Sequence, residues 1–180
     1  MNIVLIGMKG CGKTTLGRLL AKKLQLTFID SDTAIEQMHR QEKGEALLFR
    51  EIFKRYGEAY FSALETRTLQ HIAQTCETTK IALACGGQTP LREKNQQILS
   101  GLGTIIYLQV SEPVLLKRIL AHGVPAFFPY PDDPEKSLHE LLAQRLPVYK
   151  KLAHITVDVS AGTPDEAVHT ILTELRYDEH

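Results

Sequence analysis

The sequence predicts an α/β fold, a parallel sheet with helices on both faces, from two features of its pattern. Short apolar, β-branched runs alternate along the chain with longer amphipathic segments, which is typical of strand–helix–strand units. The runs lack polar alternation, as expected of strands buried on both faces of a parallel sheet. The 180 residues contain no internal repeat or interdomain linker. We therefore expect a single domain over residues 1–180.

Each expected element follows from its local pattern. Strands are expected at the short apolar runs 2–6, 27–29, 80–85, 104–110 and 155–159. The first helix is expected over 15–24, because Leu16, Leu19 and Leu20 recur at the spacing of one helical face. A break at Tyr56-Gly57 separates two later helices, and Ser111 and Pro113 mark another helix start. The later helices are expected at 33–39, 46–55, 58–77, 92–99, 113–121, 135–151 and 164–175.

Composition narrows the class of protein. Lys+Arg and Asp+Glu number 21 each, so no overall basic field favours nucleic acid or an anionic membrane. No apolar stretch approaches the ~18 residues that span a bilayer, and no charged leader precedes the first strand. The three cysteines lack metal-ligand spacing and suggest reduced thiols. We expect a cytoplasmic monomer that acts on a small molecule, with no nucleic-acid or membrane partner.

Residues 7–14 read GMKGCGKT, the G-x-x-x-x-G-K-T pattern, between an expected strand and an expected helix. The glycines let backbone N–H groups point at phosphate oxygens, and the helix adds its positive N-terminal end. Lys13 is expected to reach the β- and γ-phosphates, and the Thr14 hydroxyl to bind Mg²⁺. The flanking strand and helix disfavour a chance glycine-rich turn. The expected nucleotide-binding residues are Gly10, Cys11, Gly12, Lys13, Thr14 and Thr15.

Two carboxylates, Asp30 and Asp32, follow the second expected strand. Ligands bind at the carboxyl ends of strands in open α/β sheets, so these groups are candidates for chemistry. Asp30 would hold a water of the Mg²⁺ shell, and Asp32 would take the proton from an attacking acceptor hydroxyl. The alternative is a structural one, in which Asp32 or Ser31 caps the next helix. Their place downstream of the phosphate loop favours the functional interpretation.

Residues 122–134 contain four prolines, one glycine and three aromatic residues, which exclude a regular helix or a central strand. This segment is either a plain surface connection or a mobile lid over nucleotide and substrate. The aromatic side chains Phe127, Phe128 and Tyr130 favour a lid.

The motifs, taken together, resemble the shikimate kinase family over nearly the whole chain. The matching segments are the phosphate loop, 28–32, 52–53, 57–65, 84–87, 91–93, 106–108, 116–118 and Arg145-x-Pro147-x-Tyr149. The resemblance implies a nucleoside-monophosphate-kinase-like fold with a five-stranded parallel sheet in the order 2-3-1-4-5. It also implies a mobile lid at about 122–134 and a substrate-binding region at about 31–65.

The resemblance further assigns roles to single residues. It implies that Asp32 binds substrate hydroxyls and that Arg145 binds the substrate carboxylate, whereas sequence alone would also allow Arg145 a surface ion pair. It implies that Arg118 packs on the adenine and that Gly86 and Gly87 approach the substrate.

Three departures from the family pattern alter the acceptor side. Ser62 stands where the family pattern F-R-x-x-E has an arginine, and Gln88 replaces the third glycine of G-G-G. Val124 stands where the lid has an arginine that meets the transferring phosphoryl group. The loss at Ser62 is expected to leave Glu65 without a neighbouring cation, with residues 54, 55 and 92 as nearby replacements.

The function expected from these observations is transfer of the ATP γ-phosphate to a substrate hydroxyl. Lys13 and Asp32 are the expected catalytic residues, Thr14 and Asp30 the metal-binding ones, and ATP and Mg²⁺ the cofactors. The resemblance favours conversion of shikimate to shikimate 3-phosphate in aromatic amino-acid synthesis. A different hydroxylated acceptor is one alternative, because Ser62 and Gln88 would suit it, and a nucleotide-binding protein with little transfer is another. The expected substrate-binding residues are Asp32, Ser62, Gly86, Gly87, Gln88 and Arg145.

Overall fold

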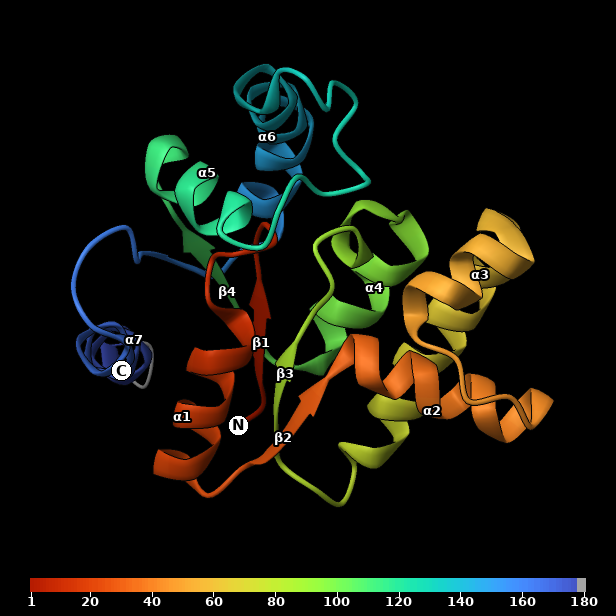
Figure 1. Cartoon of the computed structure of the whole chain (residues 1–180). Helices are drawn as coiled ribbons and strands as arrows, with labels where there is room; N and C mark the ends of the chain where they lie inside the picture. Colours follow the sequence, from red (N-terminus) through yellow and green to blue (C-terminus); the bar gives the residue numbers. More distant parts are fainter. Residues whose placement is uncertain (178–180) are drawn as a thin grey trace.

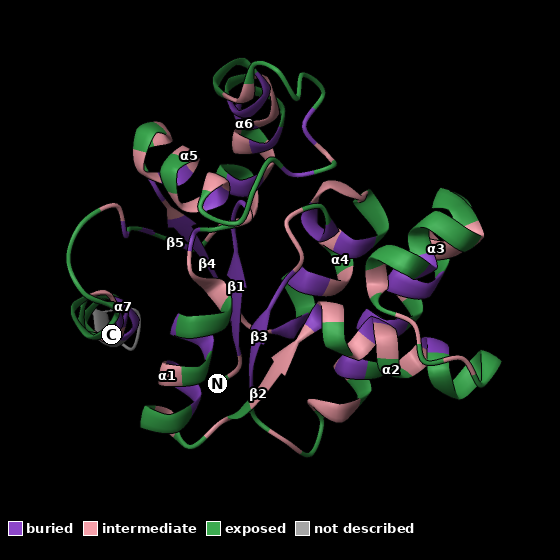
Figure 2. Ribbon diagram, viewed as in Figure 1, coloured by how far each residue is buried: buried purple, intermediate pink, exposed green. Residues whose placement is uncertain are grey.

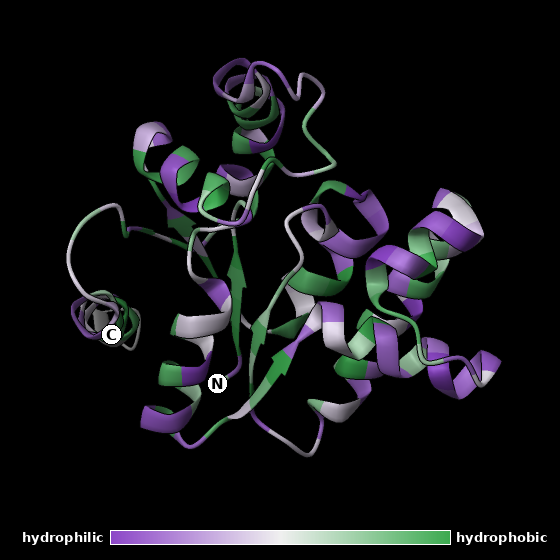
Figure 3. Ribbon diagram, viewed as in Figure 1, coloured by the Kyte–Doolittle hydropathy of each residue, from purple (hydrophilic) through white to green (hydrophobic). Residues whose placement is uncertain are grey.

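The computed structural model describes residues 1–177, and their centre is a five-stranded parallel sheet in the order β2-β3-β1-β4-β5. The predicted strand order is therefore confirmed. The strands are β1 Ile3–Ile6, β2 Thr27–Asp30, β3 Ile81–Ala84, β4 Thr104–Gln109 and β5 Ile155–Asp158. In the central strand, Val4 lies opposite Leu83 on β3 and Ile105 on β4. All four residues of β1 are fully buried, and Figures 2 and 3 show the central strands buried and hydrophobic.

Helices cover both faces of the sheet (Figure 1). Their bounds are α1 Lys13–Leu24, α2 Ser31–Lys43, α3 Phe49–Thr75, α4 Glu93–Leu102, α5 Glu112–Leu120, α6 Pro134–Leu152 and α7 Pro164–Tyr177, with a short 3-10 helix at Thr89–Leu91. Helices α1 and α7 pack against each other and contact strands of the sheet, and α4 and α6 both contact β4. The helices alternate buried and exposed residues along their length, as expected of elements that bury one face (Figure 2).

Helix α2 is longer than expected, because both of its ends are capped. It begins at Ser31, where Asp30 Oδ1 accepts a hydrogen bond from the Asp32 N–H at 3.1 Å. It ends at Lys43, and the following Gly44, with a φ of 73°, provides the left-handed cap. Helix α3 contains the predicted break: Gly57 has φ 78° and ψ 175° in the middle of an otherwise helical segment. Its first half begins at Phe49, three residues later than expected.

Helices α2 and α3 have a small hydrophobic core of their own. Ile35, Ile52 and Leu64 form a buried cluster separate from the main one. His39 is fully buried beside it, and its Nδ1 shares a hydrogen bond with the Tyr60 hydroxyl at 2.9 Å. The two helices therefore pack as a unit at one side of the sheet, where Figure 1 shows them.

Residues 122–133, between α5 and α6, form no helix or strand, as the sequence predicts. Phe128 is nevertheless buried in the main core. The Ser137 hydroxyl accepts from the Tyr130 N–H at 2.9 Å and donates to its carbonyl at 2.8 Å. These contacts fix the segment to the start of α6 in this conformation. In the part of the chain that the structure describes, no helix is long and apolar enough to cross a membrane.

The turn between α4 and β4 generates a stability prediction. A Cβ atom added at Gly103 would lie 2.3 Å from the backbone oxygen of Asn2, whereas one added at Gly101 would meet nothing within 4 Å. We expect Gly103→Ala to lower the free energy of unfolding by about 1–3 kcal/mol through overpacking. Gly101→Ala, in helix α4, should raise it by about 0.5–1 kcal/mol. Urea denaturation of both variants tests this, and equal stabilities would contradict it.

Candidate active site

The phosphate loop lies between β1 and α1, and its backbone has the conformation that the sequence predicts. Gly7, Gly10 and Gly12 all have positive φ, at 143°, 86° and 100°. Gly12 precedes α1, and no side chain caps that helix. The first N–H groups of the 12-residue helix are therefore available to an anion, and its positive end faces the loop.

Lys13 bends back over this loop. Its Nζ donates to the carbonyls of Gly7 and Met8, both at 2.8 Å, and lies 3.6 Å from the Cys11 sulfur. The ammonium is thus held at the centre of the loop, at the position where phosphate oxygens would replace the carbonyls as its partners. Cys11 itself is buried beneath the loop.

Asp30 connects the loop helix to α2. Its Oδ2 accepts a hydrogen bond from the Thr14 hydroxyl at 2.9 Å, while its Oδ1 caps α2. The proposed structural alternative, a cap by Ser31 or Asp32, is therefore wrong, because Asp30 is the capping residue. The Ser31 hydroxyl instead accepts from the Gly86 N–H at 2.7 Å. The Asp32 side chain is left free of the capping role.

The Asp32 carboxyl, in the first turn of α2, lies beside Gly86, which follows β3. Its pKa is raised to about 6. Burial is the main cause, the neighbouring Asp30 charge adds to it, and Lys13 opposes it. A Cβ atom on Gly86 would lie 2.9 Å from Asp32 Oδ1, so the missing side chain leaves room for the carboxyl in its present position. A carboxylate with a pKa close to neutral accepts a proton more readily than an ordinary aspartate, which suits a general base.

Arg145, on α6, faces the same region from the other side. Only 5% of its surface is exposed, and no carboxylate among residues 1–177 lies within 4 Å of its guanidinium. Its Nη1 lies 3.5 Å from the Met8 sulfur, and its guanidinium carbon is 5.8 Å from the Phe127 ring centre. The surface ion pair considered from sequence is therefore wrong. A buried guanidinium without an acidic partner is suited to binding an anionic ligand.

The glycines after β3 lie between Asp32 and Arg145. A Cβ atom on Gly87 would be 3.7 Å from Arg145 Nη1, and the Gly87 carbonyl accepts a hydrogen bond from the Tyr149 hydroxyl. Gln88 follows as an exposed residue at the start of the 3-10 helix. The structure therefore brings Asp32, Gly86, Gly87 and Arg145 together as predicted.

A cavity of about 280 Å³ opens on the other side of the phosphate loop. Gly10, Gly12 and Thr15 line it, and so does Arg118. Arg118 donates to the Val159 carbonyl at 3.0 Å, which holds its side chain along the cavity wall. The position fits a base that continues from phosphates bound in the loop.

The comparison with known proteins decides the family. The shikimate kinase family model matches residues 9–176. The chain belongs to the shikimate kinase family. The shikimate kinase of Trichormus variabilis is 38% identical over 173 residues, covering 96% of this chain and 89% of that protein. A shikimate kinase of Thermodesulfovibrio yellowstonii is 35% identical, covering 96% and 94%. The solved Acinetobacter baumannii shikimate kinase in complex with shikimate has a TM-score of 0.84 at 30% identity, covering 98% and 93%.

The departure from the family pattern at Ser62 has a different consequence from the expected one. Glu65 does have a neighbouring cation, because Arg92 Nε lies 3.1 Å from its Oε2. Thr89 and Asn95 donate to the same carboxylate at 2.7 and 3.0 Å. The expectation of an unpaired Glu65 is therefore wrong. Arg92 is held by Glu65, and among residues 1–177 the Ser62 hydroxyl has no hydrogen-bond partner.

One further cation near Asp32, Lys9, is not among the predicted site residues. Lys9 is half-buried in the phosphate loop, with its Nζ 5.7 Å from the centre of the same Phe127 ring that Arg145 faces. Its pKa is lowered by burial first and by the Arg50 charge second, and raised by Asp32. Lys9 stands at one of the x positions of the phosphate-loop pattern, where any residue type is allowed. Only its positive charge next to a phosphate site could have indicated a role from the sequence.

The raised pKa of Asp32 generates a second stability prediction. Folding raises the pKa of Asp32 from 3.8 to about 6, so the ionised carboxylate is less favourable in the folded state than in the unfolded chain. This loss of stability is complete above pH 6 and disappears below pH 4, where the carboxyl is protonated in both states. We expect Asp32→Asn to raise the free energy of unfolding by about 3 kcal/mol at pH 8 and to leave it nearly unchanged at pH 4.

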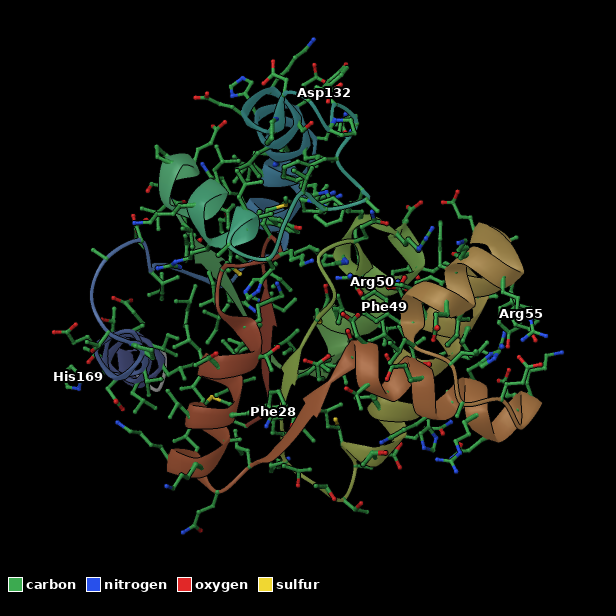
Figure 4. The ribbon with its side chains drawn as sticks, viewed as in Figure 1. Phe28, Phe49, Arg50, Arg55, Asp132 and His169 are labelled. Atoms are coloured by element: carbon green, nitrogen blue, oxygen red, sulfur yellow. The ribbon has the colours of Figure 1, made fainter. Side chains whose placement is uncertain are left out.

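Denaturant titrations at the two pH values measure this difference. Asp132→Asn, at an exposed aspartate that Figure 4 labels far from the phosphate loop, is the matched control and should show no such dependence. A gain for Asp32→Asn that is the same at both pH values would contradict the assignment.

Proposed function

We propose that this protein phosphorylates shikimate with ATP, forming shikimate 3-phosphate and ADP. The proposal rests on one observation: the Asp32 carboxyl has a pKa of about 6 and lies between the phosphate loop and Arg145, whose guanidinium has no carboxylate partner among residues 1–177. Family membership supports it, as does the similarity to a shikimate kinase solved with shikimate bound. The reaction belongs to the synthesis of aromatic amino-acid precursors.

In the proposed reaction the acceptor hydroxyl attacks the γ-phosphorus of ATP. A new oxygen–phosphorus bond forms, the bond from the γ-phosphorus to the β–γ bridging oxygen breaks, and ADP leaves. Asp32 takes the hydroxyl proton, and Lys13 with the N–H groups of the loop stabilises the charge on the phosphate oxygens. Arg145 orients the acceptor by its carboxylate.

The residues around Thr14 fit Mg²⁺. The ion prefers oxygen ligands and, in phosphate sites, uses one or two protein groups together with phosphates and water. The Thr14 hydroxyl and the Asp30 carboxylate lie 2.9 Å apart beside the phosphate loop. We infer that Thr14 binds the ion and Asp30 its water shell. Bound there, Mg²⁺ would neutralise charge on the β- and γ-phosphates.

We further propose that residues 122–134 act as a mobile lid and that residues 31–65 form the substrate-binding region. The lid proposal is supported by Phe127, which lies against both Lys9 and Arg145 and so would respond to an acceptor bound there. We also infer a cytoplasmic monomer without nucleic-acid or membrane partners. The three free cysteines and the balanced charge support that inference.

A second candidate function is phosphorylation of another hydroxylated acceptor, or nucleotide binding with little transfer. Ser62 and Gln88 favour another acceptor, because neither supplies the charge of an arginine. Val124, which is 48% exposed in the proposed lid, favours weak transfer, because it brings no cation to the phosphoryl group.

Incubation with Mg·ATP and a panel of hydroxylated acids and polyols tests the main proposal. We expect ADP release with shikimate above all others, and a loss of roughly 100- to 10,000-fold in kcat for Asp32→Asn. Glu77→Gln, at an exposed carboxylate after the end of α3, should be unaffected. Tight ATP binding with no turnover of shikimate would overturn the proposal and favour the second candidate.

The role of Arg145 gives a further prediction. Arg145→Ala should raise the KM for shikimate by roughly 10- to 150-fold, the value of one charge-assisted contact, with little change in the KM for ATP. Lys151→Ala, at an exposed position on the same helix, is the matched control and should change neither KM. A shikimate KM for Arg145→Ala equal to that of the control would exclude Arg145 from the acceptor site.

A further inference from the structure

Two cations near the phosphate loop lie against one aromatic ring, and a third acts on one of them through its charge. Lys9 from the phosphate loop and Arg145 from α6 both lie within 6 Å of the Phe127 ring centre, at 5.7 and 5.8 Å. The third, Arg50, is close enough to Lys9 for its charge to lower the pKa of the ammonium. The negative charge of Asp32 raises the pKa of Lys9 instead, so this carboxylate is also near the ammonium.

Arg50 belongs to the first turn of α3 and packs over its neighbour Phe49, with the guanidinium carbon 5.4 Å from the ring centre. Figure 4 shows both residues at the inner side of α3, towards α4, whereas Arg55 of the same helix points to the outer edge of the molecule. The phenylalanine therefore supports the guanidinium on the side of α3 that faces α4, where Arg50 is exposed.

Arg50 differs from other arginines of this region in having no acidic partner. Arg55 pairs with Glu45 at 3.3 Å, Arg67 with Glu42 at 2.8 Å and Arg92 with Glu65 at 3.1 Å. Within residues 1–177, no carboxylate lies within 4 Å of Arg50, Lys9 or Arg145. Unpaired cations around one space repel one another, and an anion bound there would relieve this repulsion.

Arg50 is also a candidate to replace the arginine that the family pattern has at the position of Ser62. Ser62 lies in the second half of α3, beyond the break at Gly57, and supplies no charge. Arg92 is held by Glu65 and Arg55 by Glu45, so neither is free to replace the missing arginine. Arg50, in the first half of the helix, is the arginine of α3 that remains unpaired and lies on the side that faces α4.

We propose that Arg50, beside Lys9, binds the carboxylate of the acceptor together with Arg145 and so determines specificity for an acidic substrate. This inference rests on the proposed phosphorylation of shikimate and adds a residue to its binding site. Arg50 acts on binding and not on the transfer step, because the reacting hydroxyl is assigned to Asp32.

The test compares Arg50→Ala and Arg50→Lys with Arg55→Ala, a matched loss of arginine on the outer side of the same helix. We expect Arg50→Ala to raise the KM for shikimate roughly tenfold or more, with kcat and the KM for ATP within about twofold of the wild type. Arg50→Lys should recover part of the loss, and Arg55→Ala should resemble the wild type. An unchanged KM for ATP shows that the variant protein is folded.

The methyl ester of shikimate separates a contact with the carboxylate from a general disturbance of the site. For this neutral acceptor, Arg50→Ala and the wild type should have similar kcat/KM. Equal losses on the acid and the ester would overturn the inference, as would a shikimate KM for Arg50→Ala equal to that of Arg55→Ala. Absence of shikimate turnover by the wild type would instead overturn the proposed function, and this inference with it.

Discussion

The active site depends on the two hydrogen bonds of one carboxylate. Asp30 accepts from the Thr14 hydroxyl on the phosphate side and from the Asp32 N–H on the acceptor side. The first contact ties α1 to the end of β2, and the second starts α2 at the residue that orients Asp32. The proposed positions of metal, phosphates and general base are therefore linked through a single side chain, which follows directly from strand β2.

The acceptor side is built differently, from charges without partners. Arg145 is buried beside Met8 and Phe127 with no carboxylate of residues 1–177 within 4 Å, and Lys9 lies near the same Phe127 ring. Burying unpaired charge lowers the stability of a protein, so such an arrangement is expected where an anion binds. Glu65 differs from these cations, because Thr89, Arg92 and Asn95 all donate hydrogen bonds to its carboxylate.

The sequence was sufficient for the fold and for most of the site, because their signals are local. The strand order implied by the family resemblance is confirmed. The loop glycines have the expected positive φ, and Asp32 lies near Gly86 as Arg145 lies near Gly87, while the binding roles of these residues stay predictions. The capping role of Asp30 was not predicted, because Asp30, Ser31 and Asp32 are all good capping residues and only their geometry distinguishes them. The Glu65–Arg92 pair spans 27 residues and requires α3 and α4 to pack together, and the orientation of Arg50 depends on its contact with the neighbouring Phe49 ring.

The measurement that tests this account most directly is the pH dependence of phosphoryl transfer in a single turnover, with phosphorylated shikimate measured as the product. If Asp32 is the base, the rate constant of the transfer step should rise through a pKa near 6 and then level off. A rate that is independent of pH between 5 and 8, with ATP and shikimate both saturating, would contradict the assignment of Asp32 as the base.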